Sequence, residues 1–220
     1  MSETPHDGWF ITLEGPDGCG KTTQTTLLAD HLRELGFDVL QTREPGGTAI
    51  GDQIREVLHS LENKAMHPRA EVLLYAASRA QHVEQVIRPH VAGGGVVLCD
   101  RYADSTMAYQ GYGHQLDLDH LKQLTAFATG GLWPDLTLYF DIDAEEGLRR
   151  RQAAVRDEGA EWNRLDDYAL AFHRRVRQGY KQLIAQQPER WIVLDGSGPV
   201  EAVQEEVRRE VMARLAMGKH

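Results

Sequence analysis

The chain has 220 residues, with 24 Lys and Arg against 33 Asp and Glu, so its formal net charge is −9 with His neutral. Hydrophobic residues at 41% and charged residues at 26% are typical of a globular domain, and this length suits a single α/β core. The acidic balance disfavours a nucleic-acid binder, which would neutralise phosphates with a basic face. No apolar run reaches the roughly 18–20 residues that span a bilayer. We therefore expect one domain over residues 1–220, with neither nucleic acid nor a membrane as partner.

The cellular compartment follows from two further features. Cys19 and Cys99 are too few for a disulfide framework and indicate a reducing compartment. Residues 1–8 lack the basic and apolar regions of a signal peptide. We expect a cytoplasmic protein, with loose tails over residues 1–8 and 217–220.

Short β-branched and aromatic runs alternate along the chain with longer amphipathic stretches, which is typical of βαβ units and a parallel sheet. The predicted strands cover residues 9–14, 38–42, 95–99, 136–142 and 191–194. The predicted helices cover residues 21–35, 68–91, 118–129, 144–155, 168–186 and 200–215. The sequence thus predicts a doubly wound α/β fold of the P-loop NTPase type, with a five-stranded parallel sheet flanked by helices.

The segment after the first strand reads Gly-Pro-Asp-Gly-Cys-Gly-Lys-Thr and matches the phosphate-binding pattern G-x-x-x-x-G-K-[ST]. Its glycines let successive N–H groups point at phosphate oxygens, and the helix that follows adds positive charge at its N-terminus. The lysine of this pattern reaches the β- and γ-phosphates, and the hydroxyl of the next residue binds the Mg²⁺ that bridges them. The residues predicted to bind ATP here are Gly15, Pro16, Asp17, Gly18, Cys19, Gly20, Lys21, Thr22 and Thr23.

Two acidic residues near the predicted phosphate site each allow two interpretations. Asp17 is either a carboxylate favoured by the helix dipole or a group that points toward a second substrate. Asp100 closes an apolar strand, where it either holds Mg²⁺ through water or merely pairs with Arg101 or a backbone group. We favour the metal for Asp100. Asp141 and Asp143 follow another strand and are weaker candidates.

The guanine-recognition motif of GTPases is absent from the sequence, because Ala65 and Met66 follow the sole Asn-Lys pair, Asn63-Lys64. Three other motifs follow strands in order: Thr-Arg-Glu-Pro-Gly-Gly-Thr at 42–48, Asp-Arg-Tyr at 100–102 and Ser-Thr-Met-Ala-Tyr-Gln-Gly at 105–111. Together with the P-loop they resemble the thymidylate kinase family of P-loop nucleoside monophosphate kinases over residues 9–215. The resemblance implies Mg²⁺-dependent transfer of the ATP γ-phosphoryl group to dTMP, giving dTDP and ADP in dTTP synthesis. The alternatives are a kinase for UMP or CMP, and a nucleotide-binding module without turnover.

The same resemblance assigns residues to the sugar, phosphate and base of dTMP. Asp17 matches the acid that contacts the sugar 3′-hydroxyl, Arg43 matches a residue near the phosphate, and Arg101 matches the arginine that clamps it. Tyr75 and Arg79 lie four residues apart and so share one helix face. By resemblance, Tyr75 stacks on thymine and Arg79 donates to its exocyclic oxygen.

Further dTMP contacts are implied around the third motif. Ser105 and Thr106 match positions near the pyrimidine ring. Tyr109 matches the residue that crowds the sugar 2′ position and so favours deoxyribose, and Gln110 is a further base contact. The resemblance also allows a cis peptide bond between Glu44 and Pro45.

The segment 149–167 is rich in charged residues and is predicted to form a short mobile lid. Members of this family either carry a basic residue in the P-loop or supply arginines from the lid. In this sequence Gly18 stands at the P-loop position where the basic residue would be. The resemblance therefore implies the bacterial type with lid arginines, of which Arg149 is assigned to ATP. Two interpretations hold for the adenine, which either stacks on Arg149 or contacts the backbone at 196–200. Some of the lid arginines alternatively belong to a charged helix that only faces solvent. The residues predicted to act in catalysis are Asp17, Lys21, Arg101, Arg150 and Arg164.

The predicted helix 68–91 carries a wide apolar face that includes Leu73 and Val83. By resemblance this helix packs against its mate in a homodimer. The sequence alone is equally consistent with a helix whose apolar face is buried in the core of one chain.

Overall fold

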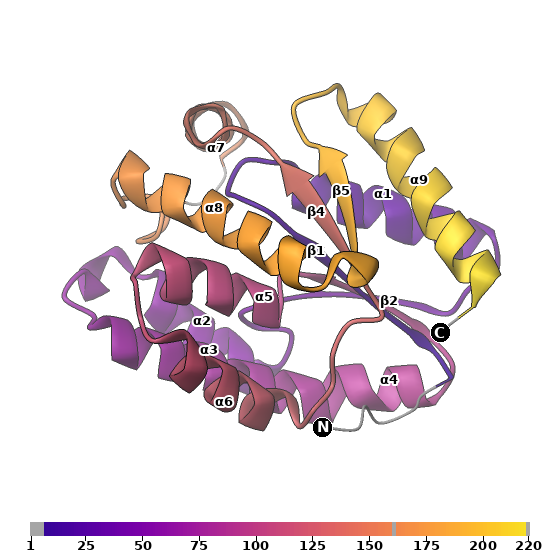
Figure 1. The fold of residues 1–220 in the computed structure, drawn as a ribbon, viewed down its shortest axis with the longest axis horizontal. Coiled ribbons are helices and arrows are strands. Elements are labelled where there is room, and N and C mark those ends of the chain that lie inside the picture. Colours follow the sequence, from indigo (N-terminus) through magenta and orange to yellow (C-terminus); the bar gives the residue numbers. More distant parts are fainter. Residues whose placement is uncertain (1–6, 160–161, 219–220) are drawn as a thin grey trace.

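The computed structural model describes residues 7–159 and 162–218. Five strands form one sheet in the order β2-β3-β1-β4-β5, and each neighbouring pair is parallel (Figure 1). The strands are β1 (Trp9–Glu14), β2 (Val39–Arg43), β3 (Val96–Asp100), β4 (Leu136–Asp141) and β5 (Trp191–Asp195). The predicted fold class is confirmed, and each strand boundary differs from the sequence prediction by one residue at most.

The described helices fill the connections between the strands. They are α1 (Lys21–Glu34), α2 (Ala49–His59), α3 (Pro68–His82), α4 (Arg88–Ala92), α5 (Ala103–Thr106), α6 (Leu118–Thr129), α7 (Ala144–Glu158), α8 (Leu170–Gln186) and α9 (Val200–Met217). Wider π-helical turns, η2 (Val83–Ile87) and η3 (Met107–Gly113), and the short 3₁₀ turns η1 (Leu61–Asn63) and η4 (Pro188–Arg190) complete the set. None of the helices within residues 7–159 and 162–218 is long and apolar enough to cross a membrane.

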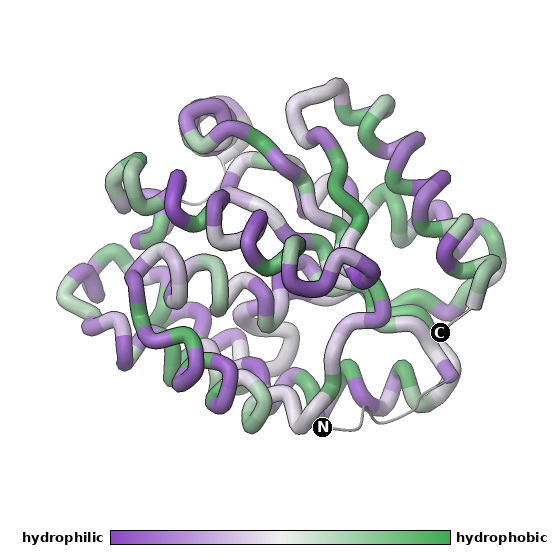
Figure 2. Tube along the Cα trace, viewed as in Figure 1, coloured by the Kyte–Doolittle hydropathy of each residue, from purple (hydrophilic) through white to green (hydrophobic). Residues whose placement is uncertain are grey.

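Helices cover both faces of the sheet, so its strands are apolar on both sides. Ile11 and Leu13 of β1 pack against α1 and α9, whereas Phe10, next to Ile11 in the strand, points to the opposite face and packs with Val83 and Val91. The covering helices are amphipathic, and α9 alternates between hydrophobic and hydrophilic stretches along its trace (Figure 2). The core is therefore two apolar layers, one on each face of the sheet.

The predicted helix 68–91 is not uniform. α3 ends at His82, and the π-helical turn Val83–Ile87 joins it to α4, which contains Pro89. Proline has no N–H to donate and its ring clashes with the carbonyl four residues earlier, so the helix widens ahead of it. The apolar pattern predicted the helical run but not this change of winding.

Helix α2 and the helical run 103–113 were not predicted from the sequence. The Thr48 hydroxyl caps α2 by accepting from the Gly51 N–H at 2.9 Å. A Cβ on Gly51 would lie 2.9 Å from the carbonyl oxygen of Gly46. Glycine at 51, which reads as a helix breaker, is required here by the close approach of the loop after β2.

The predicted tails are wrong at two described residues. Gly8 is buried, and its N–H donates to the Val91 carbonyl at 2.9 Å. At the other end α9 continues to Met217. Of the other predicted tail residues, Asp7 and Gly218 are described, whereas 1–6 and 219–220 lie outside the described residues.

Candidate active site

A cleft of about 1260 Å³ opens at the carboxyl ends of β1, β2 and β3, where ligands bind in open α/β sheets. The volume suits two nucleotides, because single-ligand pockets measure about 300–1,000 Å³. Its walls bring together most of the residues predicted from the sequence: Asp17, Gly18, Gly20, Lys21, Thr22, Thr23, Arg43, Tyr75, Arg79, Asp100, Arg101, Ser105, Thr106, Tyr109, Gln110, Arg149 and Arg150. Gly15, Pro16, Cys19 and Arg164 lie outside these walls.

The P-loop connects β1 to α1 and holds its own lysine. Gly15 and Gly20 have positive φ values of 152° and 90°, which glycine adopts readily. The Lys21 ammonium donates to the carbonyl oxygens of Gly15 at 3.0 Å and Pro16 at 2.9 Å. Cys19 is 3% exposed and belongs to the core. The loop therefore presents its ammonium at the centre of the cradle, fixed by backbone oxygens.

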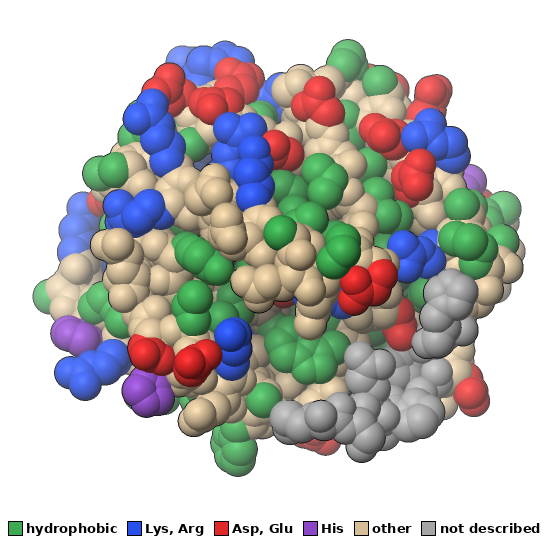
Figure 3. Space-filling view, viewed as in Figure 1, with side chains coloured by type: hydrophobic (Ala, Val, Ile, Leu, Met, Phe, Trp, Pro, Cys, Tyr) green, Lys and Arg blue, Asp and Glu red, His purple; other side chains and the backbone are tan. Residues whose placement is uncertain are grey.

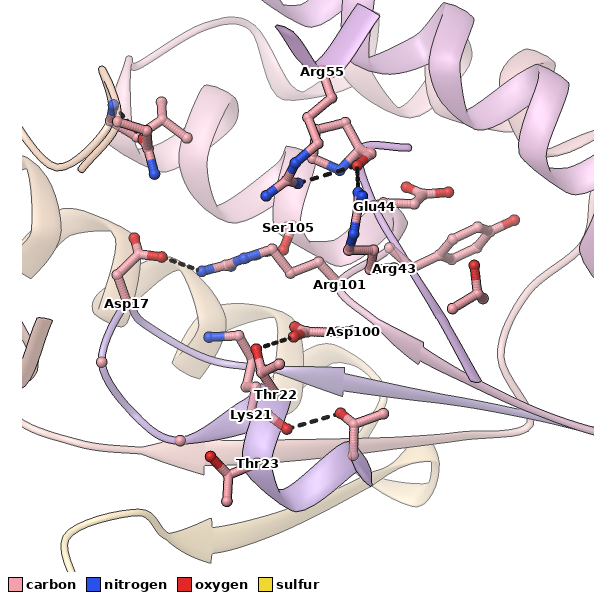
Figure 4. A pocket seen from close by; sticks show the side chains of 18 of the residues that line it. Asp17, Lys21, Thr22, Thr23, Arg43, Glu44, Arg55, Asp100, Arg101 and Ser105 are labelled. Carbon is pink, nitrogen blue, oxygen red and sulfur yellow. Dashed lines mark hydrogen bonds and ion pairs between the residues drawn. The ribbon is translucent and has the colours of Figure 1, made fainter. Parts of the chain in front are cut away.

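Asp17 faces across the cleft rather than toward its own helix (Figure 4). Arg101 Nη2 donates to Asp17 Oδ1 at 2.6 Å, and the Tyr109 hydroxyl donates to Asp17 Oδ2 at 2.8 Å. Burial would raise the pKa of Asp17, but the charges of Arg101 and Lys21 hold it well below its usual range. The carboxylate is thus ionised at neutral pH and acts as an acceptor.

Thr22 and Asp100 meet at the first turn of α1, where the Thr22 hydroxyl donates to Asp100 Oδ2 at 2.6 Å (Figure 4). A hydroxyl and a carboxylate are oxygen ligands of the kind that Mg²⁺ prefers. The rival acids are engaged elsewhere: Asp141 pairs with Arg177 and Lys181, and Asp143 caps α7. The hydrogen-bond partner described for the Asp100 side chain is Thr22 rather than Arg101, and the metal role of Asp100 stays a prediction.

A buried carboxylate that the sequence did not reveal supports Arg101. Glu14, at the end of β1, accepts from the Tyr102 N–H at 2.8 Å and from the Ser105 hydroxyl at 2.6 Å. Arg101 in turn donates to Ser105 Oγ at 3.2 Å and has a φ of 71°, rare for a residue with a side chain. Ser105, predicted near the pyrimidine, thus links Glu14 to the guanidinium. Burial and the charge of Asp104 raise the pKa of Glu14 to about 7.

Three arginines point into the same side of the cleft: Arg43, Arg55 and Arg101 (Figure 4). Arg43 Nη1 donates to the Pro45 carbonyl at 2.8 Å, and Arg55 Nη1 reaches the same oxygen at 3.2 Å. The Glu44–Pro45 bond is cis, as expected. Arg55 was missed because α2 was not predicted; the capping Thr48 seven residues earlier was the available signal.

The two predicted base contacts on α3 differ in how far their side chains are buried and hydrogen-bonded. Tyr75 is partly exposed in the cleft. Arg79 is 2% exposed, and its guanidinium donates to Glu44, to the Thr106 hydroxyl at 2.9 Å and to the Tyr102 carbonyl at 3.0 Å. Neither Glu44 nor its role was predicted from the sequence.

Helix α7 carries the lid arginines, and its outer surface gathers both charge types (Figure 3). Arg149 is 70% exposed and pairs with Glu146. Arg150 also contacts Glu146 and donates to the carbonyl oxygens of Gly196 at 2.8 Å and Ser197 at 2.7 Å. Arg150 therefore ties the lid helix to the loop after β5.

At Arg164 and Asp166, which the structure describes, the predicted lid is buried. Arg164 is 3% exposed, and its guanidinium contacts Glu71, the Tyr168 hydroxyl and the Leu58 carbonyl. Asp166 is 4% exposed and pairs with Arg151. The structure does not bring Arg164 to the phosphate side of the cleft, because all three guanidinium nitrogens are engaged in this buried cluster.

The P-loop touches the lid helix at Gly18. A Cβ built on Gly18, whose φ is 78°, would lie 2.0 Å from the carbonyl oxygen of Gly147 in α7. A Cβ on Gly147 would in turn lie 2.6 Å from the Asp17 carbonyl. The two backbones approach so closely that the structure has no room for a side chain at Gly18.

Comparisons with known proteins agree with this geometry. The family model described as Thymidylate kinase matches residues 13–207. The thymidylate kinase of Roseiflexus sp. (strain RS-1) is 53% identical over 214 residues, covering 94% of this chain and 95% of the relative. That of Exiguobacterium sp. (strain ATCC BAA-1283 / AT1b) is 50% identical over 211 residues, covering 96% and 97%.

A solved structure is similar over nearly the same length. The crystal structure of thymidylate kinase from Ehrlichia chaffeensis superposes with a TM-score of 0.74 at 32% sequence identity, covering 94% of this chain and 99% of that one. A kinase that uses ATP, and in general a metal ion, is therefore the class to which the cleft conforms. The chain belongs to the thymidylate kinase family.

Proposed function

We propose that this protein transfers the γ-phosphoryl group of ATP to dTMP, giving dTDP and ADP. The observation that carries the proposal is the pair that Asp17 of the P-loop forms with Arg101, which follows β3, 2.6 Å apart and within one cleft. Two polyanions must meet end to end for this reaction, and fixed cations offset their repulsion. The family relationship supports the same activity.

The acceptor phosphate is assigned to Arg43, Arg55 and Arg101, which line one side of the cleft. Asp17 accepts from the sugar 3′-hydroxyl and orients the acceptor. Tyr109, whose hydroxyl already contacts Asp17 and Arg101, occupies the space beside the sugar and disfavours a 2′-hydroxyl.

The base is assigned to the α3 side of the cleft. Tyr75 stacks on thymine, Arg79 donates to its exocyclic oxygen, and Thr106 and Gln110 complete the wall. Discrimination against dUMP depends on one methyl group, which is worth about 1–3 kcal/mol in an apolar pocket.

The donor side is assigned to the P-loop with Lys21 and to the lid helix with Arg149 and Arg150. Thr22 and Asp100 would hold Mg²⁺ together with phosphate oxygens and water, and no group of three acidic, His or Cys side chains in the described residues offers a fuller metal site. When bound, the ion neutralises charge on the transferring phosphoryl group. Lid closure over both nucleotides excludes water from the transfer.

The proposal extends to the assembly and the compartment. Leu73 of α3 is 57% exposed and Phe127 of the adjacent α6 is 85% exposed, which suits a homodimer through this side of the molecule. Equilibrium sedimentation of the purified chain tests it. Both cysteines are free and buried, in keeping with a cytoplasmic protein.

Release of ADP, measured with dTMP, dUMP, UMP and CMP as acceptors, tests the activity. We expect dTMP to be the best substrate, with UMP and CMP inactive. Activity on ribonucleotides alone would identify the UMP or CMP kinase instead. Binding of ATP without ADP release for any acceptor would identify a nucleotide-binding module.

A further inference from the structure

Glu71, a buried carboxylate on α3, joins the base side of the cleft to the lid. Its side chain is fully buried, with 0% exposed. Gln110 Nε2 donates to Glu71 Oε1 at 2.7 Å, and His114 Nε2 lies 3.2 Å from the same oxygen. The other oxygen, Oε2, accepts from Arg164 Nη2 and lies 3.4 Å from the Tyr168 hydroxyl. One carboxylate thus holds two segments that are far apart in sequence.

The charges in this cluster fix the direction of its hydrogen bonds. Burial alone would raise the pKa of Glu71, but the nearby His114, the hydrogen bond from Gln110 and the charge of Arg164 lower it to about 2. An ionised carboxylate only accepts hydrogen bonds, and a guanidinium only donates them. Glu71 is therefore an obligate acceptor at neutral pH.

This constraint sets the orientation of the Gln110 amide. Because Glu71 cannot donate, it must receive the Nε2 branch of Gln110, and the Oε1 branch is left for another donor. No residue that the structure describes donates to Gln110 Oε1, and Gln110 lines the cleft. The side chain therefore offers an acceptor to a ligand in the cleft and keeps its donor on Glu71.

We propose that Glu71, held by Arg164, is a positioning residue that presents the Gln110 carbonyl oxygen to the base and thereby selects pyrimidines with an N–H at ring position 3. Thymine carries that N–H, whereas cytosine carries a lone pair there, which would face the amide oxygen unpaired. The inference rests on the proposed function, because it requires the base to lie beside Gln110. Glu71 itself touches no substrate.

The decisive variant is Glu71→Gln. Arg164 can only donate, so it retains the carbonyl oxygen of the new amide and turns the NH₂ group toward Gln110. The Gln110 amide then inverts and offers its own NH₂ group to the base. We expect the KM for dTMP to rise and the inhibition constant of dCMP to fall. The ratio of the dCMP inhibition constant to the dTMP KM should therefore fall by about tenfold or more, with kcat at saturating dTMP nearly unchanged.

Three further variants separate this role from a general loss of structure. Glu71→Asp keeps an obligate acceptor and should retain most of the discrimination. Asp167→Asn removes the exposed pair that Asp167, three residues after Arg164, forms with Lys64 at 2.6 Å, and should leave the ratio at the wild-type value. If Glu71→Gln does not fold, the double variant Glu71→Gln/Arg164→Met replaces it, because it leaves no lone buried charge. In that variant no guanidinium or carboxylate sets the direction of the amide, so the same loss of discrimination is expected.

The outcomes distinguish this inference from the proposed function. If the wild-type protein phosphorylates dTMP and the folded Glu71→Gln or double variant keeps the wild-type ratio, the role of Glu71 is overturned and the proposed function stands. If the wild-type protein neither binds nor phosphorylates dTMP, both are overturned. A reduced ratio in Glu71→Gln that Glu71→Asp restores supports the inference.

Discussion

Arg101 Nη2 and Asp17 Oδ1 lie 2.6 Å apart, which joins the residue after β3 to the P-loop across the mouth of the cleft. Both side chains are largely buried, at 18% and 22% exposed, so the pair is a fixed part of the site. The arrangement places a carboxylate and a cation where sugar hydroxyl and phosphate of one nucleotide are proposed to bind.

Asp17→Asn should lower kcat about a hundredfold, because a misplaced acceptor loses most of the benefit of orientation. The KM for ATP should change little. Since the pKa of Asp17 lies well below its usual range, its charge persists through the assay range, and the wild-type pH profile should show no limb from this group. Steady-state kinetics with Asp30→Asn, an exposed partner of Arg33, as control would measure the effect; equal rates in the two variants would contradict the role.

Glu14 should make stability fall as pH rises. Its pKa is raised from 4.5 to about 7 in the folded protein, so between these values the unfolded chain ionises while the folded chain retains the proton. The free energy of unfolding should decrease by about 3 kcal/mol across this window. The stabilisation that comes from keeping Glu14 protonated in the folded protein is fully present only below pH 4.5. Urea unfolding at several pH values would show this slope reduced in Glu14→Gln. The exposed Glu34→Gln should keep it, and an equal slope in all three proteins would refute the assignment.

Gly18→Ala should impair the enzyme through the lid helix. The new methyl group would lie 2.0 Å from the Gly147 carbonyl oxygen, so α7 and its arginines must shift. We expect kcat/KM for ATP to fall by about tenfold to a hundredfold. Gly36→Ala is the matched control, because its φ of 89° imposes similar strain with nothing within 4 Å of the added Cβ. If both variants lost stability alone and kept their ATP kinetics, the lid contact would be unimportant for turnover.

Asp100→Asn should raise the Mg²⁺ concentration needed for half-maximal rate by about tenfold, because one charged oxygen is lost from the proposed pair with Thr22. Chelation of divalent ions should abolish activity in the wild type. Titration of rate against Mg²⁺ checks both, with Asp141→Asn as control, since Asp141 lies at the end of β4 and pairs with Arg177 of α8. A shift in the control as large as that in Asp100→Asn would argue against the metal role.

The fold was predictable because its signals are local. The strands other than β2 are short runs dominated by apolar residues, and the P-loop glycines specify a backbone that few other residues permit. Helix α2 could not be found in the same way, because Gly51 serves a tertiary contact and the helix buries only Gly51 and Leu58. Arg55, which α2 carries, was lost with it.

The supporting carboxylates of the site were beyond sequence reasoning. Glu14, Glu44 and Glu71 come from three different elements, and each is buried against donors that lie far away in the chain. Motif comparison predicted Arg43, Arg79 and Arg101 in the cleft, but not Arg55 and not these three buried acids. For Arg164 it predicted a catalytic role but not the pairing with Glu71, because pattern alone does not distinguish an arginine beside a phosphate from one paired with a buried acid.

Arg79 shows what this supporting layer implies for recognition. With contacts to Glu44, Thr106 and the Tyr102 carbonyl, its guanidinium is immobile before any nucleotide arrives. Rotamer entropy that a flexible side chain would lose on binding has already been spent during folding. Affinity for the base should therefore depend on shape and hydrogen-bond match at a rigid surface, and a poorly matched nucleobase cannot be accommodated by adjustment of this arginine.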